Sequence, residues 1–453
     1  MLQNTLSEHL TEIAHAILEN SLPPAVKEKA KMCFLDFLAA AYAGANSKTF
    51  QIGISVLKNM GHGESTLIGT PLKGSVLGAA FFNGMIAHAE EVDDAHRYAS
   101  GLHLGATIFP ASLALSEMRQ LGGEPYLRSV VAGYEIASRI CRAVDAGHRE
   151  RGYHSTGTIG PFGAGVASAG CIGLDREKMT HALGIAGSTS AGLFAFLEEG
   201  ATVKHMHTGR ASMDGLLCAL LAENGLTGPK RILEAKEGFF NAYARHADID
   251  EITRPLNDIY EISFAYHKIH SACGHSFPSI DAALAVQAEI GEHVDRIESI
   301  RVRTYRVAAV LTRKNPQTIP EARFSIPFII GLALVKGRVS RSELVPEILK
   351  DPRILRIAEC VDVIEDKAMT ERFPKLRTAE LTITMKDGRV ISRSVDVPRG
   401  MPDNPVFAMH IEAKFRSLSA GVLSPTQQDR IIEKVRSMDT AESMTTISRL
   451  LSI

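Results

Sequence analysis

The sequence contains no tryptophan, and aromatic residues make up only 6 % of the chain. Surfaces that stack nucleic-acid bases need aromatic side chains, so this composition argues against such a surface. An excess of one charge is also lacking, because 50 basic residues stand against 51 acidic ones. A balanced chain has no long-range field that would attract a polyanion or an anionic membrane. We therefore expect no nucleic-acid partner, and we expect an anionic substrate to be held by local positive groups.

Long apolar runs and paired cysteines are missing as well. No run of about 18 consecutive apolar residues occurs, so the sequence predicts no membrane span. The N-terminal stretch places Leu6, Leu10, Ile13 and Ile17 at helical spacing and lacks the basic start and apolar block of a signal peptide, which predicts a first helix. The six cysteines show neither CxxC nor zinc-ribbon spacing. That pattern is typical of reduced thiols and favours a cytoplasmic protein.

What the chain does contain is a long series of helical patterns. A chain of 453 residues exceeds the roughly 250–300 at which one hydrophobic core stops growing, so two domains are expected. Met32, Leu35, Leu38 and Tyr42 recur every three or four residues, and the same spacing continues through residues 1–265. The abundance of Ala and Gly indicates closely packed helices. We expect a large all-helical domain over this range.

A different pattern follows in residues 266–400. The segment 297–307 alternates apolar and polar residues, and the segment 379–397 does so on both sides of Asp387-Gly388, which predicts a β-hairpin. The stretch "VPRGMPDNP", with three prolines and a glycine, reads as a linker. Residues 401–453 look helical again and are expected to return to the large domain. The predicted fold is therefore mainly α, with a smaller α/β domain.

Polar residues gather in four stretches with apolar or glycine-rich surroundings. They are "AHAEEVDDAHRYASGLH" (87–103), "GYHSTGTIGPFGAG" (152–165), "GATVKHMHTGRAS" (200–212) and "YHKIHSACGHSFPSIDA" (266–282). In each, an imidazole or amine lies where a helix is expected to start, and helix N-termini favour bound carboxylate or phosphate. We interpret the four stretches as parts of one anion site.

Each stretch also has a plainer interpretation. His103 can be a core histidine bonded to a carbonyl, and the glycines after His154 can serve helix packing. Lys204 can lie in an exposed basic loop, or act as a base or a carboxylate-binding group. In the fourth stretch Lys268, His270, Cys273 and His275 lie close together, and Cys273 could be a thiol nucleophile, although nothing else suggests acyl transfer.

Cofactor and metal sites are not predicted. The stretch after His154 lacks GxGxxG and follows no strand, which argues against a dinucleotide site. Several residues are of metal-ligating type, but they lack a recognised zinc or iron spacing, and HExxH is missing. These residues are Asp93, Asp94, His96, His103, His205 and His207. The expectation is chemistry without a metal or cofactor.

In their order along the chain, these motifs resemble the MmgE/PrpD family. The resemblance extends through "EARFSIPFIIGLAL" (321–334) and "VPRGMPDNP", over nearly the whole chain. It implies a helical domain, an α/β lid domain, a homodimer and a site between the domains. It also implies cofactor-independent chemistry on a di- or tricarboxylate. Activities in the family include dehydration of 2-methylcitrate, decarboxylation of cis-aconitate and epimerisation of iminodisuccinate.

The resemblance also assigns site residues. It implies His103 and His154 as active-site histidines and Lys204 and Lys268 as active-site lysines. Further residues are expected to bind substrate: Glu91, Asp93, Asp94, His207, Arg210, Cys273 and His275. Three positions depart from the decarboxylases, which have Asp where this chain has Glu91, Thr where it has Ala95, and His where it has Cys273. These departures weaken the interpretation as a decarboxylase.

The expected mechanism follows from charge. A carbanion beside a carboxylate needs cations, so Lys204 and Lys268 would hold the carboxylates, with Arg210 a weaker candidate. His154 would remove a proton and His103 would donate one, oriented by Asp93 and Asp94. We expect a hydro-lyase of the 2-methylcitrate dehydratase type. The alternatives are an epimerase or isomerase of an amino- or hydroxydicarboxylate, a cis-aconitate decarboxylase, and a non-catalytic carboxylate-binding relative.

Overall fold

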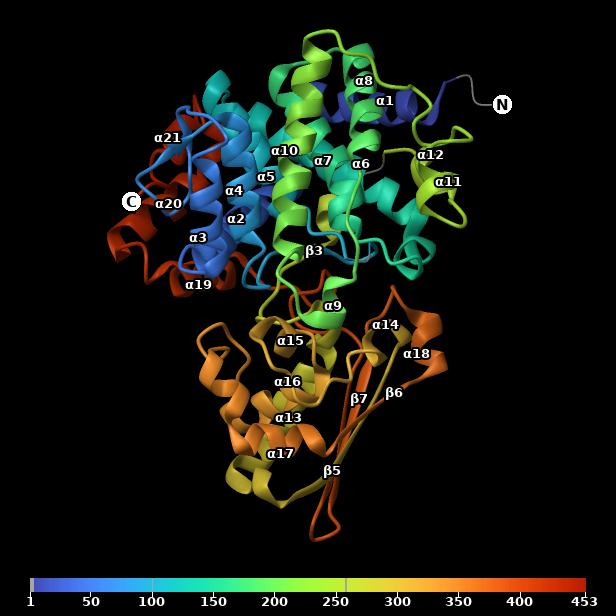
Figure 1. Ribbon diagram of the computed structural model, residues 1–453, viewed down its shortest axis with the longest axis vertical. Helices are drawn as coiled ribbons and strands as arrows, with labels where there is room; N and C mark the ends of the chain where they lie inside the picture. The colour runs from blue at the N-terminus through green and yellow to red at the C-terminus, as the bar shows by residue number, and fades with distance from the viewer. Residues whose placement is uncertain (1–3, 100, 257–258) are drawn as a thin grey trace. The chain divides into compact units, whose positions relative to one another are not determined.

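The chain divides into two compact units. The computed structural model describes residues 4–99, 101–256 and 259–453. The first, here called the helical unit, comprises Met1–Ala195, Val203–Ala265 and Phe407–Ile453. The second, the α/β unit, comprises Phe196–Thr202 and Tyr266–Val406. Figure 1 shows both units, and each is described here by itself.

The helical unit consists of helices joined by loops with a few two-residue strands. Its long helices are α1 (Leu6–Glu19), α2 (Pro24–Gly44), α3 (Lys48–Leu57), α4 (Val76–Ala87), α5 (Gly105–Arg119), α6 (Gly123–Glu150), α7 (Ser155–Ile172), α8 (Arg176–Thr189), α10 (Lys204–Glu223), α19 (Ala408–Ser419) and α20 (Pro425–Arg436). Its short helices and strands are α11 (Phe239–Tyr243), α12 (Ile249–Thr253), α21 (Thr445–Ser448), β1 (Ser65–Thr66), β2 (Lys73–Gly74) and β3 (Ala95–His96). The predicted mainly helical fold is confirmed.

Small residues let the central helices approach closely, as the composition predicts. A Cβ added at Gly84 of α4 would lie 2.9 Å from the Cα of Gly209 on α10. A Cβ at Gly133 of α6 would lie 2.6 Å from the carbonyl oxygen of Gly163 on α7. Larger side chains at these positions would push the helix axes apart. The glycines therefore fix the spacing of the helices whose ends carry the candidate site.

The chain leaves the helical unit and later returns to it. Helices α19 and α20, red in Figure 1, lie beside the blue helix α2 near the start of the chain. Lys414 of α19 forms an ion pair with the fully buried Asp36 of α2 at 2.6 Å. The hydroxyl of Tyr42, also in α2, donates to the carbonyl oxygen of Leu451 at 3.0 Å. The segment from Phe407 onward thus completes the core of this unit.

The α/β unit contains a mixed four-stranded sheet in the order β6-β5-β7-β8. Its strands are β5 (Ile297–Thr304), β6 (Val361–Glu365), β7 (Ala379–Met385) and β8 (Val390–Val395), and its helices are α9 (Phe196–Glu199), α13 (Phe277–Ile290), α14 (Arg306–Ala309), α15 (Ile319–Arg323), α16 (Ile326–Lys336), α17 (Pro352–Glu359) and α18 (Lys367–Arg372). β5 pairs with β6 in parallel and with β7 antiparallel. The predicted hairpin is confirmed, because β7 and β8 are antiparallel neighbours and Gly388 in their turn has φ +84°.

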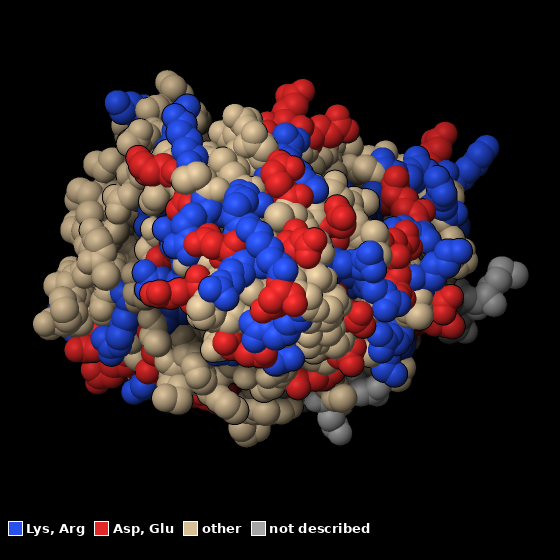
Figure 2. Space-filling view, turned by 90° about the horizontal axis from the view of Figure 1, so that it is seen from below, with Lys and Arg blue, Asp and Glu red and all other residues tan. Residues whose placement is uncertain are grey.

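The surface carries charges of both signs, as the balanced numbers of basic and acidic residues predict. On the face that Figure 2 shows, basic and acidic side chains are intermingled, without a large area of one sign. In residues 4–99, 101–256 and 259–453, no helix has both the length and the apolar character that crossing a membrane requires.

Candidate active site

Three helix N-termini of the helical unit carry the imidazole and amine groups that the sequence singled out. His103 lies two residues before α5, His154 is the N-cap residue of α7, and Lys204 is the first residue of α10. All three side chains are buried, with exposed fractions of 7 %, 1 % and 5 %. Helix N-termini carry partial positive charge and free N–H groups. This part of the helical unit is therefore suited to a bound anion.

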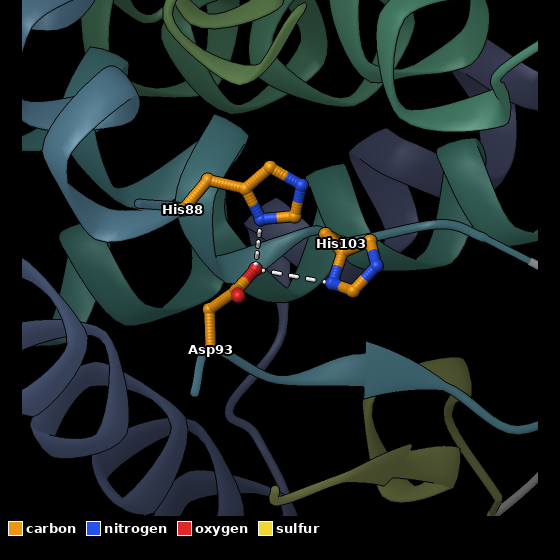
Figure 3. A group of neighbouring side chains, drawn as sticks. All are labelled: His88, Asp93 and His103. Carbon is orange, nitrogen blue, oxygen red and sulfur yellow. Dashed lines mark hydrogen bonds and ion pairs between the residues drawn. The ribbon is translucent and has the colours of Figure 1, made fainter. Parts of the chain in front are cut away.

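A carboxylate lies between two of the imidazoles, as Figure 3 shows. Asp93 Oδ2 is 2.7 Å from Nδ1 of His88 and 3.0 Å from Nδ1 of His103. The ring centroids of the two histidines are 4.6 Å apart. We call His88, Asp93 and His103 the imidazole–carboxylate cluster. Its ligand-type atoms lie within 4.8 Å of one another, so among the described residues this group could also hold a metal ion.

His154 is paired with a second histidine from α10. Its Nδ1 is 2.9 Å from Nδ1 of His207, so one ring donates a proton in this bond and the other accepts it. Burial lowers the pKa of His154 well below its usual value, and the neighbouring His207 and Lys204 lower it further. Burial, with Lys204 and Arg210, also lowers the pKa of His207 to about 4. Both rings are therefore neutral at pH 7.

Lys204 is paired with Glu91, one of the three positions at which this chain differs from the decarboxylases. The ammonium forms a close ion pair with Oε1 of this carboxylate, and both side chains are buried, at 6 % and 4 % exposure. Glu91 has φ +53°, in the left-handed region that a residue with a Cβ rarely adopts. Such strained positions are concentrated at functional sites. The loop between α4 and β3 thus bends sharply where it meets Lys204.

Asp94 has a different environment from its neighbour Asp93. Its Oδ2 accepts from the Tyr134 hydroxyl at 2.7 Å, and its Oδ1 accepts from the Gly105 N–H at 2.9 Å, at the start of α5. Burial raises the pKa of Asp94 to about 7, and the nearby carboxyl of Asp36 contributes. Both oxygens thus bond protein groups. We interpret Asp94 as the residue that fixes the start of α5, and through it the position of His103.

Arg210, a further predicted residue of α10, has two clear partners. The guanidinium of Arg210 forms an ion pair with Asp214 at 3.0 Å and donates to the carbonyl oxygen of Thr189 at 3.0 Å. The side chain of Arg210 remains 37 % exposed. Its charge lowers the pKa of His207, so Arg210 influences the site electrostatically.

The remaining predicted residues, Lys268, Cys273 and His275, belong to the α/β unit. Lys268 is 1 % exposed and Cys273 is 8 % exposed. Cys273 donates its backbone N–H to the carbonyl oxygen of Arg323 at 2.9 Å, and His275 Nδ1 is 2.8 Å from the Tyr305 hydroxyl. Close to them is a buried arginine, Arg377, which the sequence analysis did not single out. Its guanidinium lies 4.8 Å from the Tyr266 ring centroid and donates to the Tyr266 hydroxyl at 3.1 Å.

Sequence reasoning missed three residues of the helical unit that shape the site. His88 shares Asp93 with His103, as described above. The Thr156 hydroxyl accepts from the N–H of His103 at 3.1 Å and so ties the two helix starts together. The Phe194 ring packs edge-on against His154 with centroids 4.8 Å apart. His88 and Thr156 lie within two of the four stretches that the sequence analysis singled out, whereas Phe194 lies outside all of them.

The chain thus consists of two units, and in the helical unit buried histidines, a lysine and carboxylates meet at the starts of three helices. The model of the MmgE/PrpD N-terminal domain matches residues 8–252, and the model of the MmgE/PrpD C-terminal domain matches residues 270–440. The chain therefore belongs to the MmgE/PrpD family, as the resemblance predicts.

Named relatives differ in how much of the chain they match. Cis-aconitate decarboxylase of Aspergillus terreus is 26% identical over 481 residues, covering 99% of this chain and 96% of the relative. Cis-aconitate decarboxylase of Mus musculus is 25% identical over 468 residues, covering 100% and 94%. The mitochondrial 2-methylcitrate dehydratase of Yarrowia lipolytica is 27% identical over 275 residues, covering 54% and 52%. The decarboxylases thus match the whole chain, and this dehydratase about half of it.

Proposed function

We propose that this chain is a cofactor-independent lyase that acts on a di- or tricarboxylate by moving a proton at a carbon next to a carboxylate. The observation that supports the proposal most is the pair of buried imidazoles, His103 and His154, with ring centroids 6.5 Å apart and Lys204 beside them. Two acid–base groups and a cation are what such a reaction needs. The family and its named relatives support the same substrate class.

His154 is the proposed base. A neutral imidazole that donates through Nδ1 to His207 carries its lone pair on Nε2, where it can accept a proton from carbon. The low pKa of free His154 makes it a weak base before substrate binds. A bound carboxylate would raise that pKa, because negative charge nearby favours the imidazolium. The base would thus gain proton affinity when an anionic substrate is present.

His103 is the proposed acid. Asp93 lies on its Nδ1 at 3.0 Å and stabilises the imidazolium form, so that Nε2–H can be donated to a leaving hydroxyl. Lys204, together with the N-termini of α7 and α10, would hold a substrate carboxylate and spread the negative charge of the carbanion. Lys268 would hold a second carboxylate, with His207, Arg210, Cys273 and His275 as further contacts.

For the particular reaction we propose dehydration, as in a 2-methylcitrate dehydratase. His154 would take a proton from the carbon next to a carboxylate, and the hydroxyl on the neighbouring carbon would leave as water with the proton from His103. The chain supplies both the base and the acid that this elimination requires. This chain has Glu91 where the decarboxylases have Asp, and Cys273 where they have His. These two differences also support dehydration over decarboxylation.

Decarboxylation of a cis-aconitate-like substrate is the second candidate. The observation in its favour is that the decarboxylases named above match 99–100% of this chain. In this reaction CO₂ leaves first and one imidazolium protonates the carbanion, so only the acid is essential. His154→Gln should then lower turnover less than His103→Gln does. Under dehydration both substitutions should lower it strongly.

Proton NMR in D₂O separates the candidates. The purified, EDTA-treated protein is incubated with 2-methylcitrate, citrate, cis-aconitate, malate, tartrate and iminodisuccinate. A new internal alkene from a hydroxy acid supports dehydration, whereas a terminal methylene with release of CO₂ supports decarboxylation. Deuterium incorporation without an alkene would overturn both in favour of an epimerase. His148→Gln is the matched control, because both nitrogens of this buried histidine bond protein groups, at 3.0 and 2.7 Å.

A further inference from the structure

His88 is a buried histidine with an unusual hydrogen-bonding environment. It follows the last residue of α4 and has an exposed fraction of 0 %. Its Nδ1 is 2.7 Å from Asp93 Oδ2, while its Nε2 is buried and has no hydrogen-bond partner in the part of the chain that the structure describes. Leaving a buried polar atom unbonded costs about 1–3 kcal/mol. A purely structural histidine, such as His148, bonds through both nitrogens.

The bond to Asp93 defines the proton positions in the cluster. An ionised carboxylate only accepts hydrogen bonds, so a ring nitrogen that faces Asp93 Oδ2 carries a hydrogen. Burial lowers the pKa of His88 to about 3, although the charge of Asp93 opposes this. His88 is therefore neutral, with its hydrogen on Nδ1. It donates to the same oxygen that lies 3.0 Å from Nδ1 of His103.

We propose that His88 is a positioning residue that holds Asp93 against His103. By donating to the same carboxylate oxygen, His88 also reduces how strongly Asp93 stabilises the imidazolium form of His103. An oxygen that already accepts one hydrogen bond offers less negative charge to a second donor. His103 then releases its proton more readily than a histidine that has a carboxylate to itself. This inference rests on the proposed function only in treating His103 as the acid, and the geometry holds for any reaction.

Other charged and titratable groups face the cluster from neighbouring elements. Lys204 of α10 lowers the pKa of His88, and Glu91 is paired with that lysine. The rings of His154 and His205 lie 6.3 and 6.5 Å from the His88 ring. The backbone carbonyl oxygen of Asp94 is 2.9 Å from His103 Nδ1. All of these stay in place when His88 alone is changed, so their effects cancel in a comparison of variants.

The test is the pKa of His103 in the ligand-free protein. The full chain is labelled with ¹³C,¹⁵N-histidine, the His103 signals are assigned by their loss in His103→Gln, and the ring shifts are followed against pH. His88→Leu removes the second donor to Asp93, so the pKa of His103 should rise by on the order of one unit. His88→Asn keeps an N–H donor at the position of Nδ1 and should restore the wild-type value.

A matched control distinguishes this effect from general damage. His205 is also buried and bonds Thr49 at 2.7 Å, and His205→Leu should leave the pKa of His103 unchanged. An unchanged or lower pKa in His88→Leu would overturn the inference. The wild-type protein gives a second test that needs no substitution, because the ¹⁵N shifts of His88 must show a neutral ring with hydrogen on Nδ1 from pH 5 to 9. A ring that titrates in this range, or carries its hydrogen on Nε2, would also overturn it.

The inference and the proposed function can fail separately. A raised pKa without turnover of any substrate in the panel supports the role of His88 and contradicts the proposed lyase. Turnover together with an unchanged pKa supports the lyase and contradicts the role of His88. Where turnover occurs, the high-pH limb of kcat/KM for His88→Leu should move upward with the pKa of His103.

Discussion

The buried ion pair between Glu91 and Lys204 gives a prediction whose size follows from the structure. The two side chains are only 4 % and 6 % exposed, so solvent screens their charges weakly. Removing one partner leaves the other charge buried without this counter-charge, and breaking a buried pair in this way typically costs about 3–5 kcal/mol. Glu91→Gln and Lys204→Met should each destabilise the protein by about this amount. The double variant removes both charges of the pair and should be more stable than either single variant.

The assay is a double-mutant cycle read from urea unfolding followed by circular dichroism. The control is the ion pair of Arg119 with Glu223 at 2.8 Å, whose side chains have exposures of 41% and 26%. Its coupling energy should be below about 1 kcal/mol, as for other surface pairs. If the losses from Glu91→Gln and Lys204→Met simply add, the reasoning about this buried pair is refuted.

The same variants link the pair to substrate binding. In Glu91→Gln the ammonium of Lys204 lacks its carboxylate, so a bound anion would satisfy it. Citrate should therefore raise the urea midpoint of Glu91→Gln more than that of the wild-type protein, by mass action. Lys204→Met should lose this response. A citrate effect that is equal in wild type and Lys204→Met would contradict the assignment of Lys204 as a carboxylate-binding residue.

Four further predictions concern the acid–base groups, one carboxyl, the helix spacing and metal removal. His154→Gln and His103→Gln should each lower kcat/KM by about 10²-fold or more, measured against the wild-type protein on the substrate found in the panel. The pKa of Asp94 is raised to about 7, so its protonated form stabilises the fold fully below about pH 4, and this contribution is lost as the pH rises through 7. Asp94→Asn should accordingly reduce the fall in Tm between pH 5 and 8. Gly209→Ala should destabilise the helical unit by about 1–3 kcal/mol, seen as a lower Tm, because its Cβ would lie 2.4 Å from the carbonyl oxygen of Phe81. Dialysis against EDTA should leave turnover unchanged, and restoration by Zn²⁺ after a loss would instead make the imidazole–carboxylate cluster a metal site.

The start of a helix is a local feature, and the sequence predicted several of the site residues for that reason. His154 and Lys204 precede runs of small residues, and both lie at helix starts as expected. The hairpin at Asp387-Gly388 is local too, because two adjacent residues determine its turn. Strand β6 was not predicted, since a five-residue run gives too short a pattern and its parallel partner β5 lies far away in the sequence.

Local sequence patterns did not predict contacts between residues that are far apart in the sequence. Asp94 and Tyr134 are 40 positions apart, and nothing in either motif indicates that they bond. The division of Asp93 between His88 and His103 depends on the path of the loop that contains them, including the bend at Glu91. The expected homodimer, the site between the domains and the roles of Lys268 and Cys273 remain predictions.

The return of residues 407–453 to the helical unit has a consequence for how the protein is made. Helix α2 buries Asp36 and Tyr42 against this segment, so the unit cannot finish folding until the segment has left the ribosome. Translation at about 5–20 residues per second leaves α2 partly uncovered for on the order of ten to forty seconds after Ala265 has been added. During that interval the apolar face of α2 is open to aggregation. Nascent chains paused before residue 407 should therefore depend more on chaperones than chains that have been released.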